Sequence, residues 1–448
     1  QQANDNNPIQ YLSTSKCYSV MQLKPSLRVF DLAMIVVSLI IGVGIFKTPS
    51  LIAAKAGNEN VFMLSWILGG VIAFLGGLTF AEIGSRLPAA GGFYKIFSVA
   101  FHPTFAFMLN WTTIITNSAS AAGVGLIGAA YINSVLLPAN LQTDAAQKFT
   151  TVIIIAMLYS INLLGIKSGS RTQNVLSGIK ILIIGFFCIS IFILPHQQTV
   201  FSNINFHSAD FKLIGVCLIA VCFSYGGYQN TINFGGDVKK PSRNIPLGIF
   251  AGVVIVITLY LLINYAYLKA LGFDGISNSN LLASDLAEKI VGDTGAKLAS
   301  TTIFISVMGF LNTSLLSNPR IYLAMVDDKV LPPVFGKMNE KTQVQVFSLS
   351  FFVILMLFML FFLGTFEKIL NSVMLIDSLS LVCAGSTLFL LRRKKTGSEL
   401  DGFRIPMYPI LPAIYVALMA AVLFSVFIND VKTGLIGTAV FLVGFPLY

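Results

Sequence analysis

The stretch IIGVGIFKTP (residues 40–49) interrupts a long apolar segment. Gly42 and Gly44 lie at its centre, and each glycine costs a helix roughly 1 kcal/mol relative to alanine. In a membrane, the backbone groups that such an interruption frees must find a partner or line a cavity. We therefore predict that residues 42–45 break a transmembrane helix and that the break binds a ligand. The alternative is a pair of small residues that lets two helices pack closely.

The composition of the chain is that of a membrane protein. Of its 448 residues, 55% are hydrophobic and 11% are charged, and the mean hydropathy is +0.81. Apolar runs long enough to cross a bilayer recur along the whole chain. We predict twelve transmembrane helices, at residues 28–56, 61–87, 96–131, 148–165, 171–194, 211–235, 246–270, 297–327, 344–364, 367–392, 407–429 and 431–447.

The distribution of basic residues predicts the topology. The net charge is +10, but the excess is uneven along the chain. If both termini are cytoplasmic, the inner loops hold about twice as many Lys and Arg residues as the outer loops, as the positive-inside rule requires. We expect a multi-pass protein of the plasma (inner) membrane with no nucleic-acid partner. Residues 1–27 are polar, so we expect a cytoplasmic tail and no cleaved signal peptide.

The cysteine and histidine positions do not suggest an enzyme. Four of the five cysteines lie in apolar runs and one in the N-terminal tail, so we expect no disulfide. The three histidines are far apart, without metal-ligand spacing. Metal-protease, nucleotide-binding and serine-hydrolase motifs are absent from the sequence. We therefore predict no catalytic activity, no cofactor and no metal site.

A second interruption resembles the first. The stretch CFSYGGYQN (residues 222–230) places two glycines and polar residues inside the sixth predicted span. Interruptions in the first helix of each of two five-helix halves are typical of inverted-repeat transporters. We predict one repeat at residues 28–194, a second at 211–392, and peripheral helices within 407–448.

Several polar residues lie inside predicted spans. Glu82 and Arg86 are one helical turn apart, which favours a structural ion pair over a role in gating. Lys180, whose burial costs about 3 kcal/mol, has either an interior partner or a route to the cytoplasmic surface. Asp377 is either functional or hydrogen-bonded to a neighbouring helix. Asn117 lies in a cluster of small residues that favours packing, and part of the cluster is available to a substrate.

Four motifs resemble those of the amino acid–polyamine–organocation superfamily, and most closely its L-type amino acid transporter branch with bacterial relatives. GVGIF with a following proline (residues 42–49) resembles G-x-G-I-F-x-x-P. The segment 81–94 resembles A-E…P-x-x-G-G-x-Y, residues 223–228 resemble F-A-Y-x-G-W, and residues 238–246 resemble V-K-N-P-x-R-N-x-P. The resemblance covers about residues 28–447.

The resemblance implies an all-α, LeuT-like fold of ten core helices in two inverted halves plus two peripheral helices. It also implies transport of amino acids by alternating access. The start of the outer half-helix offers backbone N–H groups and a dipole to a carboxylate, and carbonyl groups at both breaks suit an ammonium. The implied substrate-binding residues are Ile40, Ile41, Gly42, Val43, Gly44, Ile45, Asn117, Phe223, Ser224, Gly226 and Gly227.

Further implications concern specificity and coupling. The named pocket residues are small and uncharged, so neutral amino acids are expected, with Phe223 as a gate over the substrate. Lys180 matches the lysine that stands in for sodium in sodium-independent members, and Thr313 and Ser314 match hydroxyls that face it. An exchanger and a proton-linked carrier both remain open, with Lys180 and Asp377 as coupling candidates. The alternatives are a carrier of cationic amino acids or polyamines and, in a different class, a membrane sensor or channel.

The sequence departs from the superfamily pattern at three places. Tyr228 stands where tryptophan is common, so the gate there is expected to differ. Gly236 replaces a frequent acidic residue. The loop 132–147 has no cysteine, so we expect no disulfide-linked heavy subunit; the expected partners are an amino acid and the lipid bilayer.

Overall fold

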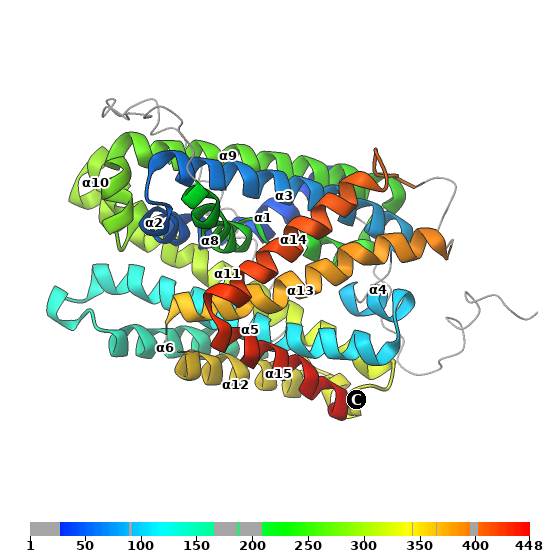
Figure 1. Ribbon diagram of the computed structural model, residues 1–448. Helices are drawn as coiled ribbons and strands as arrows, with labels where there is room; N and C mark the ends of the chain where they lie inside the picture. The colour runs from blue at the N-terminus through cyan, green and yellow to red at the C-terminus, as the bar shows by residue number, and fades with distance from the viewer. Residues whose placement is uncertain are drawn as a thin grey trace, which may run out of the picture.

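The computed structural model is a bundle of helices that run roughly along one direction (Figure 1). It describes residues 27–88, 92–164, 185, 187, 208–342, 344–363, 365–394 and 402–448. Apart from Gly185 and Phe187, the predicted fifth span lies outside these residues, and so does Lys180.

The predicted spans correspond closely to the helices of the structure. The helices before residue 165 are α1 (Val29–Ile40), α2 (Gly44–Ala56), α3 (Glu59–Arg86), α4 (Gly92–Ala100), α5 (Pro103–Leu136), η2 (Ala139–Leu141) and α6 (Asp144–Leu163). Those after residue 207 are α8 (Ser208–Tyr225), η3 (Tyr228–Asp237), α9 (Pro241–Asn278), α10 (Leu282–Val291), α11 (Asp293–Asp327), η4 (Pro333–Gly336), α12 (Val346–Leu363), α13 (Phe366–Arg393), α14 (Ile410–Asn429) and α15 (Val431–Leu447).

The length and composition of these helices indicate an integral multi-pass membrane protein. Among the described residues, nine helical segments are long and apolar enough to cross a bilayer, and α1 with α2 forms a tenth, broken span. The last predicted span contains a shorter apolar helix at residues 434–446. The total of twelve spans and the inverted-repeat arrangement stay predictions.

The structure corrects three details of the predicted helices. The third span is divided into α4 and α5, because Pro103 starts a new helix and the side chain of His102 caps it by accepting from the Thr104 N–H. α9 continues to Asn278, beyond the predicted end at 270, through a kink at Gly272. The short helix α10 was not predicted, because its ten residues are too few and too polar to span a membrane.

Glycines let the helices around the first break approach closely. A Cβ atom added at Gly252 of α9 would lie 2.5 Å from the Cβ atom of Val36 in α1. One added at Gly248 would lie 2.4 Å from the Cβ atom of Leu32. α1 therefore packs closely on α9 at Leu32 and Val36.

The predicted topology gives the bundle an inner and an outer end. Arg86 and Arg392 lie at the inner end, which is the predicted cytoplasmic side. Lys55 and Glu367 lie at the outer end. In Figure 1, α10 marks the outer end at the left and α4 marks the inner end at the right.

Candidate substrate site at two broken helices

The first break separates α1 from α2 at residues 41–43. α1 ends at Ile40 and α2 begins at Gly44, with a bend of 45° between them. The predicted break at 42–45 is confirmed in position but lies at 41–43. Ile41 already leaves helical geometry (φ −72°, ψ 87°), and Gly44 and Ile45 already belong to α2. Within the described residues, three N–H groups at the start of α2 have no acceptor within hydrogen-bond distance. These belong to Val43, Gly44 and Ile45.

The second break follows α8, which ends at Tyr225. The N–H of Gly226 donates to the carbonyl oxygen of Phe223 at 3.2 Å. Gly227 has φ 126°, a conformation that side chains strongly disfavour. A Cβ atom on Gly227 would lie 2.5 Å from the carbonyl oxygen of Leu39 in α1. The two breaks, far apart in the sequence, are thus in direct contact.

Tyr260 of α9 joins the two breaks. Its hydroxyl lies 3.1 Å from the carbonyl oxygen of Ile40 and 3.2 Å from that of Ser224. The ring is fully buried, and it lies 5.9 Å from the ring of Trp66 and 5.0 Å from that of Tyr225. This aromatic packing holds the hydroxyl where it can donate to the exposed carbonyl ends of both broken helices.

The predicted ammonium acceptors differ in how many donors they already have. The Ile40 carbonyl oxygen accepts from the Gly42 N–H at 2.8 Å and shares the single proton of the Tyr260 hydroxyl with the Ser224 carbonyl oxygen. The carbonyls of Phe223 and Ser224 each accept one bond. The Ile41 carbonyl has no donor within the described part of the chain. In this conformation Ile41 is thus the most available of the four acceptors.

The outer half-helices α2 and α8 touch at Gly44. A Cβ atom added there would lie 3.2 Å from the Cα atom of Ser224 and 3.1 Å from its Oγ atom. The hydroxyl of Thr48 donates to the Gly44 carbonyl oxygen at 2.7 Å and is hydrogen-bonded to the Ser224 hydroxyl. The two half-helices therefore pack so closely at this point that residue 44 has little room for a side chain.

Two contacts lie on the outer side of this site. The Phe223 ring, predicted as a gate, lies 6.0 Å from the ring of Phe366 at the start of α13. Beyond it, Lys55 of α2 forms an ion pair with Glu367 of α13. Both contacts connect a broken helix to α13.

Two other predicted residues lie between neighbouring helices. The Asn117 amide on α5 donates to the Asn318 side chain on α11 at 2.8 Å, so one of its donors serves helix packing here. The Asp377 carboxyl on α13 lies 3.5 Å from the Thr116 hydroxyl on α5. That contact agrees with the alternative of a carboxyl hydrogen-bonded to a neighbouring helix, and it does not test a coupling role.

The remaining coupling candidates lie on α11 and in the fifth span. Thr313 and Ser314 are half-buried on α11. The Thr313 hydroxyl donates to the carbonyl oxygen of Gly309 at 2.9 Å, within its own helix. Their predicted neighbour Lys180 lies outside the described residues, so this part of the site stays a prediction.

Nearly the whole chain matches a known protein family. The family model described as "Amino acid permease" matches residues 27–445. The chain belongs to the amino acid permease family.

Relatives of this permease are transporters. The serine/threonine exchanger SteT of Bacillus subtilis is 29% identical over 95% of this chain and 96% of its own. The rat large neutral amino acids transporter small subunit 2 is 26% identical over 95% of this chain and 80% of its own. A methylthioribose transporter of Bacillus subtilis is 26% identical over 91% of this chain and 89% of its own.

Sequence reasoning missed two residues of the site. Tyr260 reaches the breaks from α9, and Thr48 lies one helical turn after Gly44 in α2. No fixed motif position identifies either residue. The available signal was a polar atom inside an apolar run, which in a membrane needs a partner. That signal says a partner exists, but it does not say which one.

Proposed function

We propose that this permease carries neutral L-amino acids across the membrane by alternating access, without sodium, as an exchanger or a proton-linked carrier. The substrate binds between the two helix breaks. The carboxylate meets the N–H groups of Val43, Gly44 and Ile45, and the ammonium meets the Ile41 carbonyl and the free lone pairs of Phe223 and Ser224.

One observation supports this proposal above the others. Among the described residues, N–H groups without an acceptor and a carbonyl without a donor lie at breaks that touch each other. An unpaired buried backbone group is costly unless a ligand or water pairs with it. Donors on one side and acceptors on the other match the two charges that every amino acid shares. The site can thus bind the carboxylate and ammonium groups of an amino acid without using a charged side chain of the protein.

The expected side-chain specificity follows from the neutral surroundings. Ser224, Gly226, Gly227 and Asn117 carry no charge, and burying a charged substrate side chain without a partner is costly. Two relatives are named for serine and threonine and for large neutral amino acids, which supports the neutral class. The methylthioribose relative makes that sugar a necessary competitor in any test.

The expected independence of sodium rests on Lys180 with Thr313 and Ser314. A tethered ammonium and a sodium ion would repel each other by about 4 kcal/mol at 4 Å and an effective dielectric constant near 20. The Lys180 ammonium and a sodium ion are therefore not expected to occupy one site together. Lys180 and Asp377 are both proposed as coupling residues.

Uptake into proteoliposomes tests the proposal. A panel of labelled alanine, serine, leucine, arginine, glutamate, putrescine and methylthioribose is measured with and without internal substrate, a sodium gradient and a proton gradient. We expect alanine, serine or leucine to exceed the others, with no effect of sodium. Uptake dominated by arginine or putrescine favours the cationic alternative, and uptake that rises steeply with sodium rejects the role of Lys180. Ion current without uptake of any compound favours a channel.

A further inference from the structure

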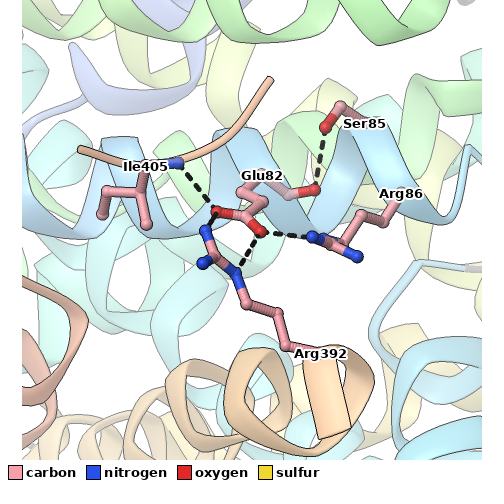
Figure 2. A network of polar contacts seen from close by, with 5 residues as sticks. All are labelled: Glu82, Ser85, Arg86, Arg392 and Ile405. Atoms are coloured by element: carbon pink, nitrogen blue, oxygen red, sulfur yellow. Dashed lines mark hydrogen bonds and ion pairs between the residues drawn. The ribbon is translucent and has the colours of Figure 1, made fainter. Parts of the chain in front are cut away.

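Glu82 of α3 is the centre of a buried network at the inner end of the bundle (Figure 2). Its Oε1 atom accepts from the Nε atoms of Arg86 and Arg392, each at 2.8 Å. Its Oε2 atom accepts from Nη2 of Arg392 at 2.7 Å and from the backbone N–H of Ile405 at 2.8 Å. The carboxylate is fully buried and has four donors, which uses the acceptor capacity of both oxygens.

The network fastens three parts of the chain together. Arg86 belongs to α3 with Glu82, Arg392 lies at the end of α13, and Ile405 lies in the segment that leads to α14. The guanidinium of Arg392 also lies 3.7 Å from the ring centre of Tyr408 in that same segment. Both arginines are mostly covered, with 7% and 20% of their side chains exposed. Opening this contact would leave charges without partners in a poorly hydrated place.

The ion pair between the outer end of α13 and α2 is much weaker than this network. Lys55 and Glu367 form a single ion pair, with 38% and 50% of their side chains exposed. Exposed pairs of this kind contribute little, because water solvates the separated charges well. Helix α13 therefore forms an ion pair with α2 at its outer end and with α3 at its inner end. The two ion pairs are roughly 37 Å apart along α13 by its rise per residue. Of these two, the outer ion pair separates more easily.

We infer that Glu82 is a positioning residue that makes the inner end of α13 a hinge. In every state of the cycle, Glu82 keeps the end of α13 and the segment 402–409 on α3. Opening towards the outer side then swings the outer end of α13 away from α2, which separates Phe366 from Phe223. The inference rests on the proposed alternating access, but its test needs no transported substrate.

Distances between pairs of spin labels test the hinge in the full-length protein in nanodiscs, after replacement of the native cysteines. The outer pair is Ala54→Cys with Lys368→Cys, and the inner pair is Pro88→Cys with Arg393→Cys. All four positions are exposed. Double electron–electron resonance reports each distance distribution in the wild-type background, in Lys55→Ala and in Glu82→Gln. Asp293→Asn, the acid of an exposed pair with Lys297, is the matched control.

The hinge predicts a distinct result for each variant. Lys55→Ala should lengthen or broaden the outer distribution and leave the inner one as in the wild type. Glu82→Gln should lengthen or broaden the inner distribution, whereas a residue that only stabilises the fold would lower the protein yield without moving it. Asp293→Asn should change neither pair.

An unchanged inner distribution in folded Glu82→Gln would overturn the role of Glu82, and two results in Lys55→Ala would overturn the hinge. In the first, the inner and outer distances lengthen together in Lys55→Ala, which means that α13 tilts as a whole. In the second, the outer distance stays fixed in Lys55→Ala. If Glu82→Gln does not fold, the Lys55→Ala measurements decide alone. Failure of the uptake panel with an intact hinge would reject the proposed function and not the hinge.

Discussion

The helix breaks and the Glu82 network differ in how many of their buried hydrogen-bonding groups have partners. At the first break, the N–H groups at the start of α2 have no acceptor among the described residues. Around Glu82, both carboxylate oxygens are fully used by four donors. Unpaired groups are available to a ligand that comes and goes, whereas saturated groups hold helices together. The contrast separates the part of this permease that binds from the part that stays fixed.

The largest expected effect is at the break. Gly44→Leu should reduce uptake to the level of empty liposomes, because its side chain meets Ser224 and must displace α2 from α8 next to the free N–H groups. Uptake of the labelled panel measures the loss, and thermal unfolding in detergent shows whether the variant is folded. Gly215 of α8 is the control position, since a Cβ atom there lies 3.6 Å from its nearest neighbour. Gly215→Ala should transport normally and Gly44→Ala should not; equal activity of the two would place the site elsewhere.

The next effect is on stability at the inner end. Glu82→Gln should destabilise the protein by about 3 kcal/mol, because two buried guanidinium groups lose their counter-charge. The midpoint of thermal or denaturant unfolding reports the change. Asp293→Asn should stay within about 0.5 kcal/mol of the wild type. Equal midpoints for the two variants would mean that the Glu82 network is not a strong tie.

A smaller effect is expected where the two breaks share a donor. Tyr260→Phe removes the hydroxyl that joins the Ile40 and Ser224 carbonyls. The lost hydrogen bond corresponds to about a tenfold change in apparent affinity. Substrate KM on each face of the membrane is the measurement. Tyr322→Phe is the control, because the buried Tyr322 hydroxyl has no partner within the described residues; a matching change there would assign the effect to the aromatic core.

The smallest effect on stability is expected at the outer end. Lys55→Ala breaks an exposed ion pair and should change the free energy of unfolding by less than about 1 kcal/mol. Unfolding in parallel with Glu82→Gln compares the two ends of α13 directly. If Lys55→Ala lowers the free energy of unfolding as much as Glu82→Gln does, the Lys55–Glu367 ion pair is not the weaker of the two.

The sequence predicted local features of both regions well. Glycines inside apolar runs indicated both breaks, because the bilayer offers no water to the backbone groups that an interrupted helix leaves unpaired. The ion pair of Glu82 with Arg86 followed from their spacing of one turn and is confirmed at 2.8 Å.

Distant partners were not predictable from the same signals. Arg392 is separated from Glu82 by 310 residues, and Tyr260 is separated from Ile40 by 220. Helical periodicity says which residues share a face of one helix, but it does not say which helix lies opposite. The same limit applies to Lys180, which the sequence marks as a costly buried charge without naming its neighbours.

The most direct test of substrate binding at the breaks uses ligands that lack one charge. Inhibition of labelled amino acid uptake is compared for L-alanine, L-alaninamide and N-acetyl-L-alanine. Each derivative loses one of the two charged hydrogen-bonding groups, so each should bind about 10- to 150-fold more weakly than L-alanine. A derivative that inhibits as strongly as L-alanine would contradict the pairing of the carboxylate with the N–H groups of α2 or of the ammonium with the carbonyls of the breaks.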